Sequence, residues 1–209
     1  MMQRNPMRPV VGIRNDRDDT LGITAAVLGE AGIPFVRFDA FEADGGWPDL
    51  EEIGGLMVFG GEMNADETDR HPQLLSQRAL MRRAVDAGLP VLGSAVQTGD
   101  RVFQWHEDTF DLPAGADLLA VGDDVPNQAF RLDRNAWAVQ FHFEVDADGV
   151  EAWLRVAEPT LSRVWKRTAG EVREELRMNL DAQQHRSRAL LAGFAGQVRS
   201  RGLDGQVAE

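Results

Sequence analysis

The stretch LMVFGG, residues 56–61, joins a short apolar run to a glycine pair and decides the fold expected for this chain. An apolar run of this length, bounded by turn residues, is typical of a strand that is buried on both faces of a sheet. Similar runs and helical patterns alternate along the first half of the chain, with strands at 10–13, 34–38 and 89–93 and helices at 20–31 and 72–87. This alternation predicts an α/β fold around a parallel sheet.

The second half of the chain has a different pattern. Short strands separated by turn residues are expected at 101–105, 117–121, 128–132 and 136–141. From Asp146 onward the pattern is helical, and Pro159 is expected to separate two helices because proline disrupts a helix interior. The predicted helices cover 151–157, 161–180 and 185–199. We therefore expect an α/β domain over residues 1–158 and a helical segment over residues 159–209.

The composition argues against several kinds of function. Asp and Glu number 34 against 22 Lys and Arg, and a formal charge of -12 repels the phosphates of nucleic acids and of anionic membranes. No run approaches the roughly 18 apolar residues of a membrane span, and no secretory signal is recognisable, so the expected location is the cytoplasm. The chain has no cysteine, which excludes disulfides, thiolate metal sites and a cysteine nucleophile. No cofactor is predicted.

Four segments carry a recognisable ordered pattern: LMVFGGEMN at 56–64, RRAVDAGLPVLG at 82–93, VFQWHEDTFDLPAGADLLA at 102–120 and NQAFRLDRNAWAVQFHFEV at 127–145. Together they resemble the class I glutamine amidotransferases, in particular proteins similar to the amidotransferase domain of GMP synthase. The resemblance covers residues 9–155 and implies a flavodoxin-like class I glutamine amidotransferase fold, here with a reduced central sheet and C-terminal helices. It also implies glutamine or another small molecule as the ligand, and hydrolysis of glutamine to glutamate and ammonia.

The resemblance assigns roles to particular residues. His142 and Glu144 match the H-x-E pair of the family, in which the imidazole takes a proton from the nucleophile and the carboxylate orients the imidazole. Gly60 and Gly61 match the loop whose backbone N–H groups hold the oxyanion, although a carboxylate at Glu62 would repel that charge. From the residues alone, a hydrogen-bonded pair at a strand end and a simple glycine turn remain open alternatives.

The nucleophile of the family is missing. After Gly93 the family continues into a G-x-C-x-G-x-Q elbow, whereas this chain reads SAVQTGD at 94–100 and then reaches the next matching segment at once. Ala95 stands where the family has its cysteine, and Gln97 stands at the second glycine of the elbow. A block that carries much of the glutamine pocket is absent near residues 94–100, so we expect a catalytically inactive member of the family.

Three alternatives remain open. Ser94, next to the lost position, would serve a hydrolase together with His142 and Glu144, although the G-x-S-x-G turn is absent. A binding or regulatory module would instead recognise a small molecule, or a protein partner through the charged helices near the C-terminus. An internally shortened copy would expose sheet edges and fold poorly.

His106 and Asp108 are further candidates, for a substrate pocket. With Glu107, His142 and Glu144 they include the ligand types of an iron or zinc site. The spacing of these residues matches no recognised metal signature, so no metal site is predicted.

Overall fold

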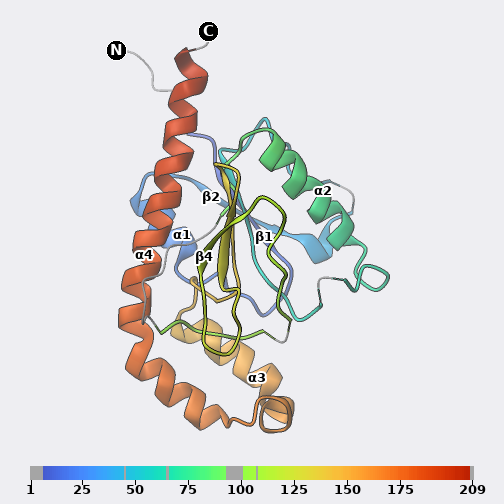
Figure 1. Ribbon diagram of the computed structural model, residues 1–209, viewed down its shortest axis with the longest axis vertical. Coiled ribbons are helices and arrows are strands. Elements are labelled where there is room, and N and C mark those ends of the chain that lie inside the picture. Colours follow the sequence, from blue (N-terminus) through green and yellow to red (C-terminus); the bar gives the residue numbers. More distant parts are fainter. Residues whose placement is uncertain (1–6, 45, 65, 93–100, 107, 208–209) are drawn as a thin grey trace.

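A sheet made of two halves forms the centre of the molecule (Figure 1). The computed structural model describes residues 7–44, 46–64, 66–92, 101–106 and 108–207. The first half has the order β2–β1–β3 and is parallel, with β1 at Val10–Arg14, β2 at Phe35–Asp39 and β3 at Gly55–Val58. The second half has the order β4–β5–β6 and is antiparallel, with β4 at Asp117–Ala120, β5 at Ala129–Leu132 and β6 at Ala136–Val139.

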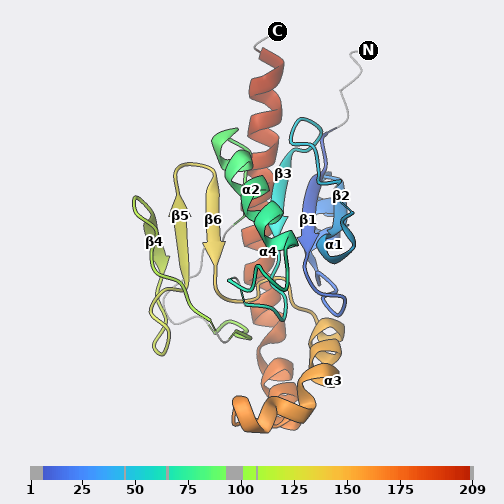
Figure 2. The same cartoon turned by 90° about the vertical axis from the view of Figure 1, so that its right-hand side faces the viewer.

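Val91 joins the two halves of the sheet. It forms one parallel bridge with Leu56 of β3 and another with Ala136 of β6. Because both bridges are parallel, β6 runs in the same direction as β1 and β3. In Figure 2 this shared direction leads down to the end of the sheet that lies nearest to α3. The carboxyl ends of these strands therefore meet at one edge, where ligand sites of α/β sheets usually lie.

Helices cover both faces of the sheet. The helical elements are α1 at Thr24–Glu30, a 3₁₀ turn at Ala40–Glu42, α2 at Gln73–Asp86, α3 at Ala147–Val164 and α4 at Ala169–Val207. Figure 1 shows α1 and α4 on one side of the sheet and α2 on the other. Within the described part of the chain, no helix is both long enough and apolar enough to cross a membrane.

The parallel strands supply two cores because successive strand residues point to opposite faces. Val10 and Met57 belong to the core that includes side chains of α1 and α4. Val11 and Leu56, their neighbours in sequence, belong to the core that includes side chains of α2. This period of two on buried strands is the pattern expected from a parallel sheet covered on both sides.

Helix α4 is part of the main core. Its buried residues Leu191, Phe194 and Val198 pack with α1 and with the parallel strands. The helix approaches the start of β3 closely, since a Cβ built on Gly55 would lie 3.0 Å from Val198 and 3.1 Å from Phe194. The division into residues 1–158 and 159–209 stays a prediction, and its boundary falls inside α3.

Replacing Val198 by Ala is expected to lower the free energy of unfolding by about 2 kcal/mol, because the cavity left against β3 adds to the lost burial of two methyl groups. Met178 lies on the same helix with 60% of its surface exposed, so Met178→Ala should change stability by less than about 0.5 kcal/mol. Urea denaturation followed by circular dichroism measures both. Equal losses of unfolding free energy in the two variants would show that Val198 does not stabilise the protein by packing against β3.

Three expected elements differ in the first two-thirds of the chain. Helix α1 begins at Thr24 rather than at Thr20, because Leu21 and Gly22 have positive φ angles of 59° and 46° and cannot join a right-handed helix. The strand expected at 89–93 is, within the described residues, a bridge at Val91. The strand expected at 101–105 is likewise a single antiparallel bridge at Phe103.

The helix boundaries predicted around Pro159 were wrong. Pro159 lies inside α3, where Leu154 and Leu161 pack into one core on either side of it, so tertiary packing outweighs the effect of the proline. The break comes instead before Thr168. There Thr168 and Glu171 form a capping box: the Glu171 N–H donates to the threonine hydroxyl (3.2 Å), and the Thr168 N–H donates to the glutamate carboxylate (2.7 Å).

Candidate functional site

Several polar residues gather at the carboxyl end of the parallel strands. Asn15 follows β1, Gly60 follows β3 by two positions, and His142 follows β6 by three. The parallel directions of these strands place the three segments at one edge of the sheet. The structure thus brings together two of the segments that the sequence singled out, the Gly60 loop and the His142 pair.

His142 and Glu144 form a short hydrogen bond. The imidazole Nδ1 lies 2.6 Å from Oε1 of Glu144, and the two side chains are only 18% and 4% exposed. An ionised carboxylate only accepts hydrogen bonds, so the proton lies on Nδ1 and Nε2 is the nitrogen that takes up or releases a proton. Nε2 lies 3.4 Å from the Trp105 carbonyl oxygen. The expected base and its orienting carboxylate are therefore in contact.

The charges around His142 favour its protonated form. Burial lowers the pKa of the imidazole, but the Glu144 carboxylate and, more weakly, Asp19 and the Trp105 carbonyl raise it, and the net effect is a pKa above the ordinary value. His142 is thus a buried group that holds a proton readily.

The glycine loop lies against the imidazole. A Cβ built on Gly60 would lie 3.8 Å from Cε1 of His142, an ordinary van der Waals contact, so the loop packs next to the ring. At Gly61 a Cβ would lie 3.0 Å from the Cβ of Asn15 and 2.6 Å from the sulfur of Met63, so the methionine side chain would have to move to accept one. The Asn15 amide donates to the Phe59 carbonyl (2.8 Å) and holds the start of the loop. Its role as an oxyanion loop stays a prediction.

Asp19 is a site residue that the sequence interpretation missed. Its side chain is 5% exposed, and Oδ1 accepts a hydrogen bond from the Leu21 N–H (2.8 Å). Burial, together with the nearby charge of Glu144, raises the pKa of Asp19 to about 6. A polar run directly after a buried parallel strand was the available signal, because such positions lie at the ligand-binding edge of the sheet.

Aromatic rings surround the imidazole. The ring centroid of Trp153 lies 4.7 Å from that of His142, and Phe103 meets the imidazole edge-on at 6.4 Å. Trp105 in turn stacks between Phe103 and Trp165, with both centroid distances 5.9 Å. These rings keep water away from the His142–Glu144 bond and so strengthen it.

His106 and Asp108 make their polar contacts within their own segment. The two ring nitrogens of His106 lie 2.8 Å from the Gln104 side-chain oxygen and 2.8 Å from the Asp108 carbonyl oxygen. A pocket role for His106 and Asp108 stays a prediction. Among the residues that the structure describes, no group of three or more His, Asp or Glu is placed to hold a metal ion. Ser94, Ala95, Gln97 and Glu107 lie outside the described residues.

Comparisons with known proteins find relatives both by sequence and by structure. The chain is 43% identical over 139 residues to the glutamine-hydrolysing GMP synthase of two strains of Porphyromonas gingivalis, a match that covers 61% of this chain and 26% of those proteins. A glutamine amidotransferase structure from Methylobacillus flagellatus has a TM-score of 0.81 at 21% identity, covering 91% of this chain and 95% of its own. The chain therefore has the flavodoxin-like fold of the class I glutamine amidotransferases.

A second structure supports the amidotransferase-like fold. A glutamine amidotransferase from Thermotoga maritima has a TM-score of 0.72 at 23% identity and covers 93% of this chain and 97% of its own. The fold class expected from the sequence is thereby confirmed. No family model matches the chain. The chain spans 26% of the length of the curated relatives that it matches.

Proposed function

We propose that this amidotransferase-like protein is a non-hydrolysing homologue that binds a small molecule at the His142–Glu144 site. One observation carries the proposal: the chain keeps the base and its orienting carboxylate in a 2.6 Å hydrogen bond, yet it contains no cysteine to be deprotonated. Ala95, at the position that matches the cysteine of the family, has a methyl group in place of the thiol.

The missing thiol removes the first covalent step of the family reaction. In that step a thiolate attacks the carboxamide carbon of glutamine, the amide nitrogen takes a proton and leaves as ammonia, and water then hydrolyses the thioester. A methyl group has no electron pair to give. Loss of a nucleophile of this kind typically costs about 10⁶ in kcat, which leaves only binding and oxyanion effects.

The groups that remain are suited to binding. A protonated His142 donates from Nε2, the Gly60 loop offers peptide groups beside it, and Glu144 and Asp19 add negative charge nearby. A ligand with both a carbonyl oxygen and N–H donors complements such a mixture. Glutamine has both in its carboxamide, and the curated relatives hydrolyse glutamine, so glutamine is the ligand that we propose.

Purified protein is expected to release no ammonia from glutamine above the rate of a His142→Ala control, because neither protein has a thiol. A coupled glutamate dehydrogenase assay measures the ammonia, with an established cysteine glutaminase as the positive control. Ammonia release that His142→Ala abolishes would contradict the proposal.

Calorimetry on the same samples should show glutamine binding that His142→Ala weakens, and no heat of binding would reject glutamine as the ligand.

A covalent probe tests the alternative in which Ser94 is a nucleophile. A fluorophosphonate labels serine hydroxyl groups that an adjacent base activates. We expect no labelling of this protein. Labelling that disappears in Ser94→Ala would support a hydrolase and reject the non-hydrolysing homologue.

A further inference from the structure

The carboxamide of Gln183 lies between the two backbone segments that carry the site. Gln183 comes from α4, far along the chain, and only 5% of its surface is exposed. Its Oε1 accepts a hydrogen bond from the Phe103 N–H (2.8 Å), and its Nε2 donates to the His142 carbonyl (2.8 Å). The orientation of the amide follows from its partners, because a backbone N–H can only donate and a carbonyl can only accept.

This carboxamide completes the pairing of residues 103 and 142. In a hydrogen-bonded antiparallel pair, the two residues exchange both N–H···O bonds. Here the His142 N–H donates directly to the Phe103 carbonyl (3.0 Å), while the Phe103 N–H and the His142 carbonyl are each bonded to Gln183. The side chain thus takes the place of a peptide unit at the end of a short, single-bridge pairing, where it fixes the backbone of His142.

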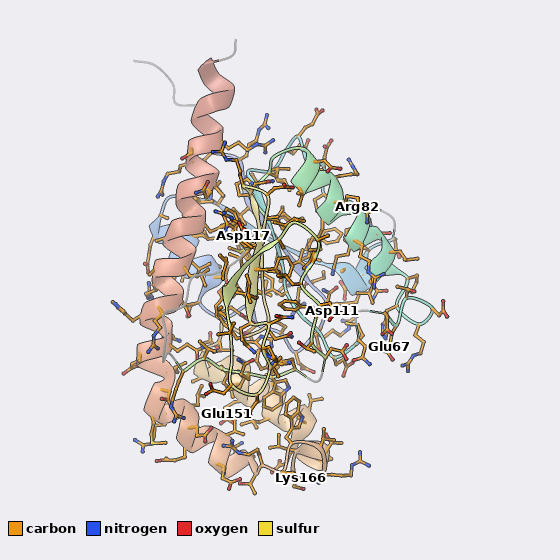
Figure 3. The ribbon with its side chains drawn as sticks, in the orientation of Figure 1. Glu67, Arg82, Asp111, Asp117, Glu151 and Lys166 are labelled. Atoms are coloured by element: carbon orange, nitrogen blue, oxygen red, sulfur yellow. The ribbon has the colours of Figure 1, made fainter. Side chains whose placement is uncertain are left out.

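Neighbouring groups of α4 hold Gln183 and the same segment. The Ser187 hydroxyl donates to the backbone carbonyl of Gln183 (2.9 Å), and the side-chain amide of Gln184 donates to the backbone carbonyl of Val145 (3.2 Å). Farther down, the Arg173 guanidinium makes a two-bond contact with Glu151 of α3 at 2.6 and 2.9 Å. Glu151 is labelled in Figure 3 at the lower end of the molecule. Helix α4 is therefore bonded both to the segment at 142–145 and to α3.

We infer that Gln183 is a positioning residue, which sets the place of the His142 ring relative to Glu144 and the Gly60 loop from a distant helix. The backbone of His142 has few other anchors, since its pairing with Phe103 is an isolated bridge. A 2.6 Å hydrogen bond depends strongly on the placement of its donor, so a small movement of this backbone lengthens it. The inference rests on these contacts and holds whether or not the chain hydrolyses glutamine.

The test is an NMR titration of the imidazole Cε1 protons in the full chain, with His142→Ala used to assign the resonance. Gln183→Met has a similar volume but no hydrogen-bonding amide. In this variant we expect the midpoint of the His142 titration to fall by about 0.5 pH or more, because the Glu144 carboxylate stabilises the imidazolium less. The Nδ1 proton, deshielded by the short bond, should move upfield.

Gln197→Met is the matched control, with the same change at an exposed position of the same helix. It should leave the His142 midpoint within about 0.2 pH of that of the unmodified chain. A purely structural role would lower stability and leave the midpoint of Gln183→Met unchanged, which overturns the inference. If Gln183→Met loses its folded spectrum, Gln183→Asn, which is too short to reach both partners, is titrated in its place. Loss of the fold in both variants would reject positioning in favour of a general structural role.

Discussion

Gly22→Ala is expected to lower the free energy of unfolding by about 3 to 5 kcal/mol. A Cβ at this position would lie 1.8 Å from the Glu144 carbonyl oxygen, so the backbone must move, and the φ angle of 46° adds strain for any residue with a side chain. The movement would break the hydrogen bond from the Ile23 N–H to that carbonyl (2.9 Å). Guanidinium denaturation measures the loss.

The matched control is Gly29→Ala in helix α1. A Cβ on Gly29 meets nothing within 4 Å, so alanine should be neutral or should stabilise the protein by about 0.5–1 kcal/mol, through helix propensity. A Gly22→Ala variant as stable as the unmodified chain would show that the loop before α1 does not hold Glu144. The titration of His142 in a surviving Gly22→Ala sample would then be unchanged as well.

Asp19→Asn is expected to stabilise the protein at pH 8 by about 3 kcal/mol. Burial raises the pKa of Asp19 from 3.8 to about 6. Each tenfold decrease in the acid dissociation constant on folding lowers the free energy of unfolding at high pH by about 1.4 kcal/mol. Between about pH 4 and pH 6 the folded protein binds more protons than the unfolded chain, so stability falls as the pH rises. Asparagine removes this cost and can still accept the hydrogen bond from the Leu21 N–H.

The advantage of Asp19→Asn should therefore be mostly lost by pH 4, where the carboxyl group is protonated in the folded protein and partly protonated in the unfolded chain. Urea denaturation at pH 4, 6 and 8 gives the dependence. Asp18→Asn, an exposed neighbour, should change stability by less than about 0.5 kcal/mol at each pH. A constant difference between Asp19→Asn and the unmodified chain across this range would rule out titration of Asp19 as the cause.

The sequence predicted the parts of the fold that depend on local pattern. The strands at residues 10–13 and 56–59 are buried apolar runs, and helix α2 has proline before its start and glycine past its end, so each carries its own signal. The break before Thr168 also has a local signal, because threonine followed by glutamate three positions later is a capping box. That signal was available and was not used.

The candidate site was predicted only in part. His142, Glu144 and Gly60 were recognisable from motifs, and the structure places them in contact or next to one another. Gln183 has no such signal, because a glutamine in a polar helix looks like any solvated residue until its distant partners are known. The hydrogen bond between Phe103 and Gln183 joins residues 80 positions apart. It depends on how α4 packs on the rest of the fold, which no local sequence pattern encodes.

The order in which the chain is made has a consequence for α4. Leu191, Phe194 and Val198, which cover β1 and β3, come later in the chain than every described strand and so leave the ribosome after them. Until then the nascent strands have one bare apolar face, and the carbonyl of His142 lacks its partner from residue 183. Folding during translation therefore stops short of the native arrangement until α4 has emerged, and the apolar face of the strands stays exposed in that interval.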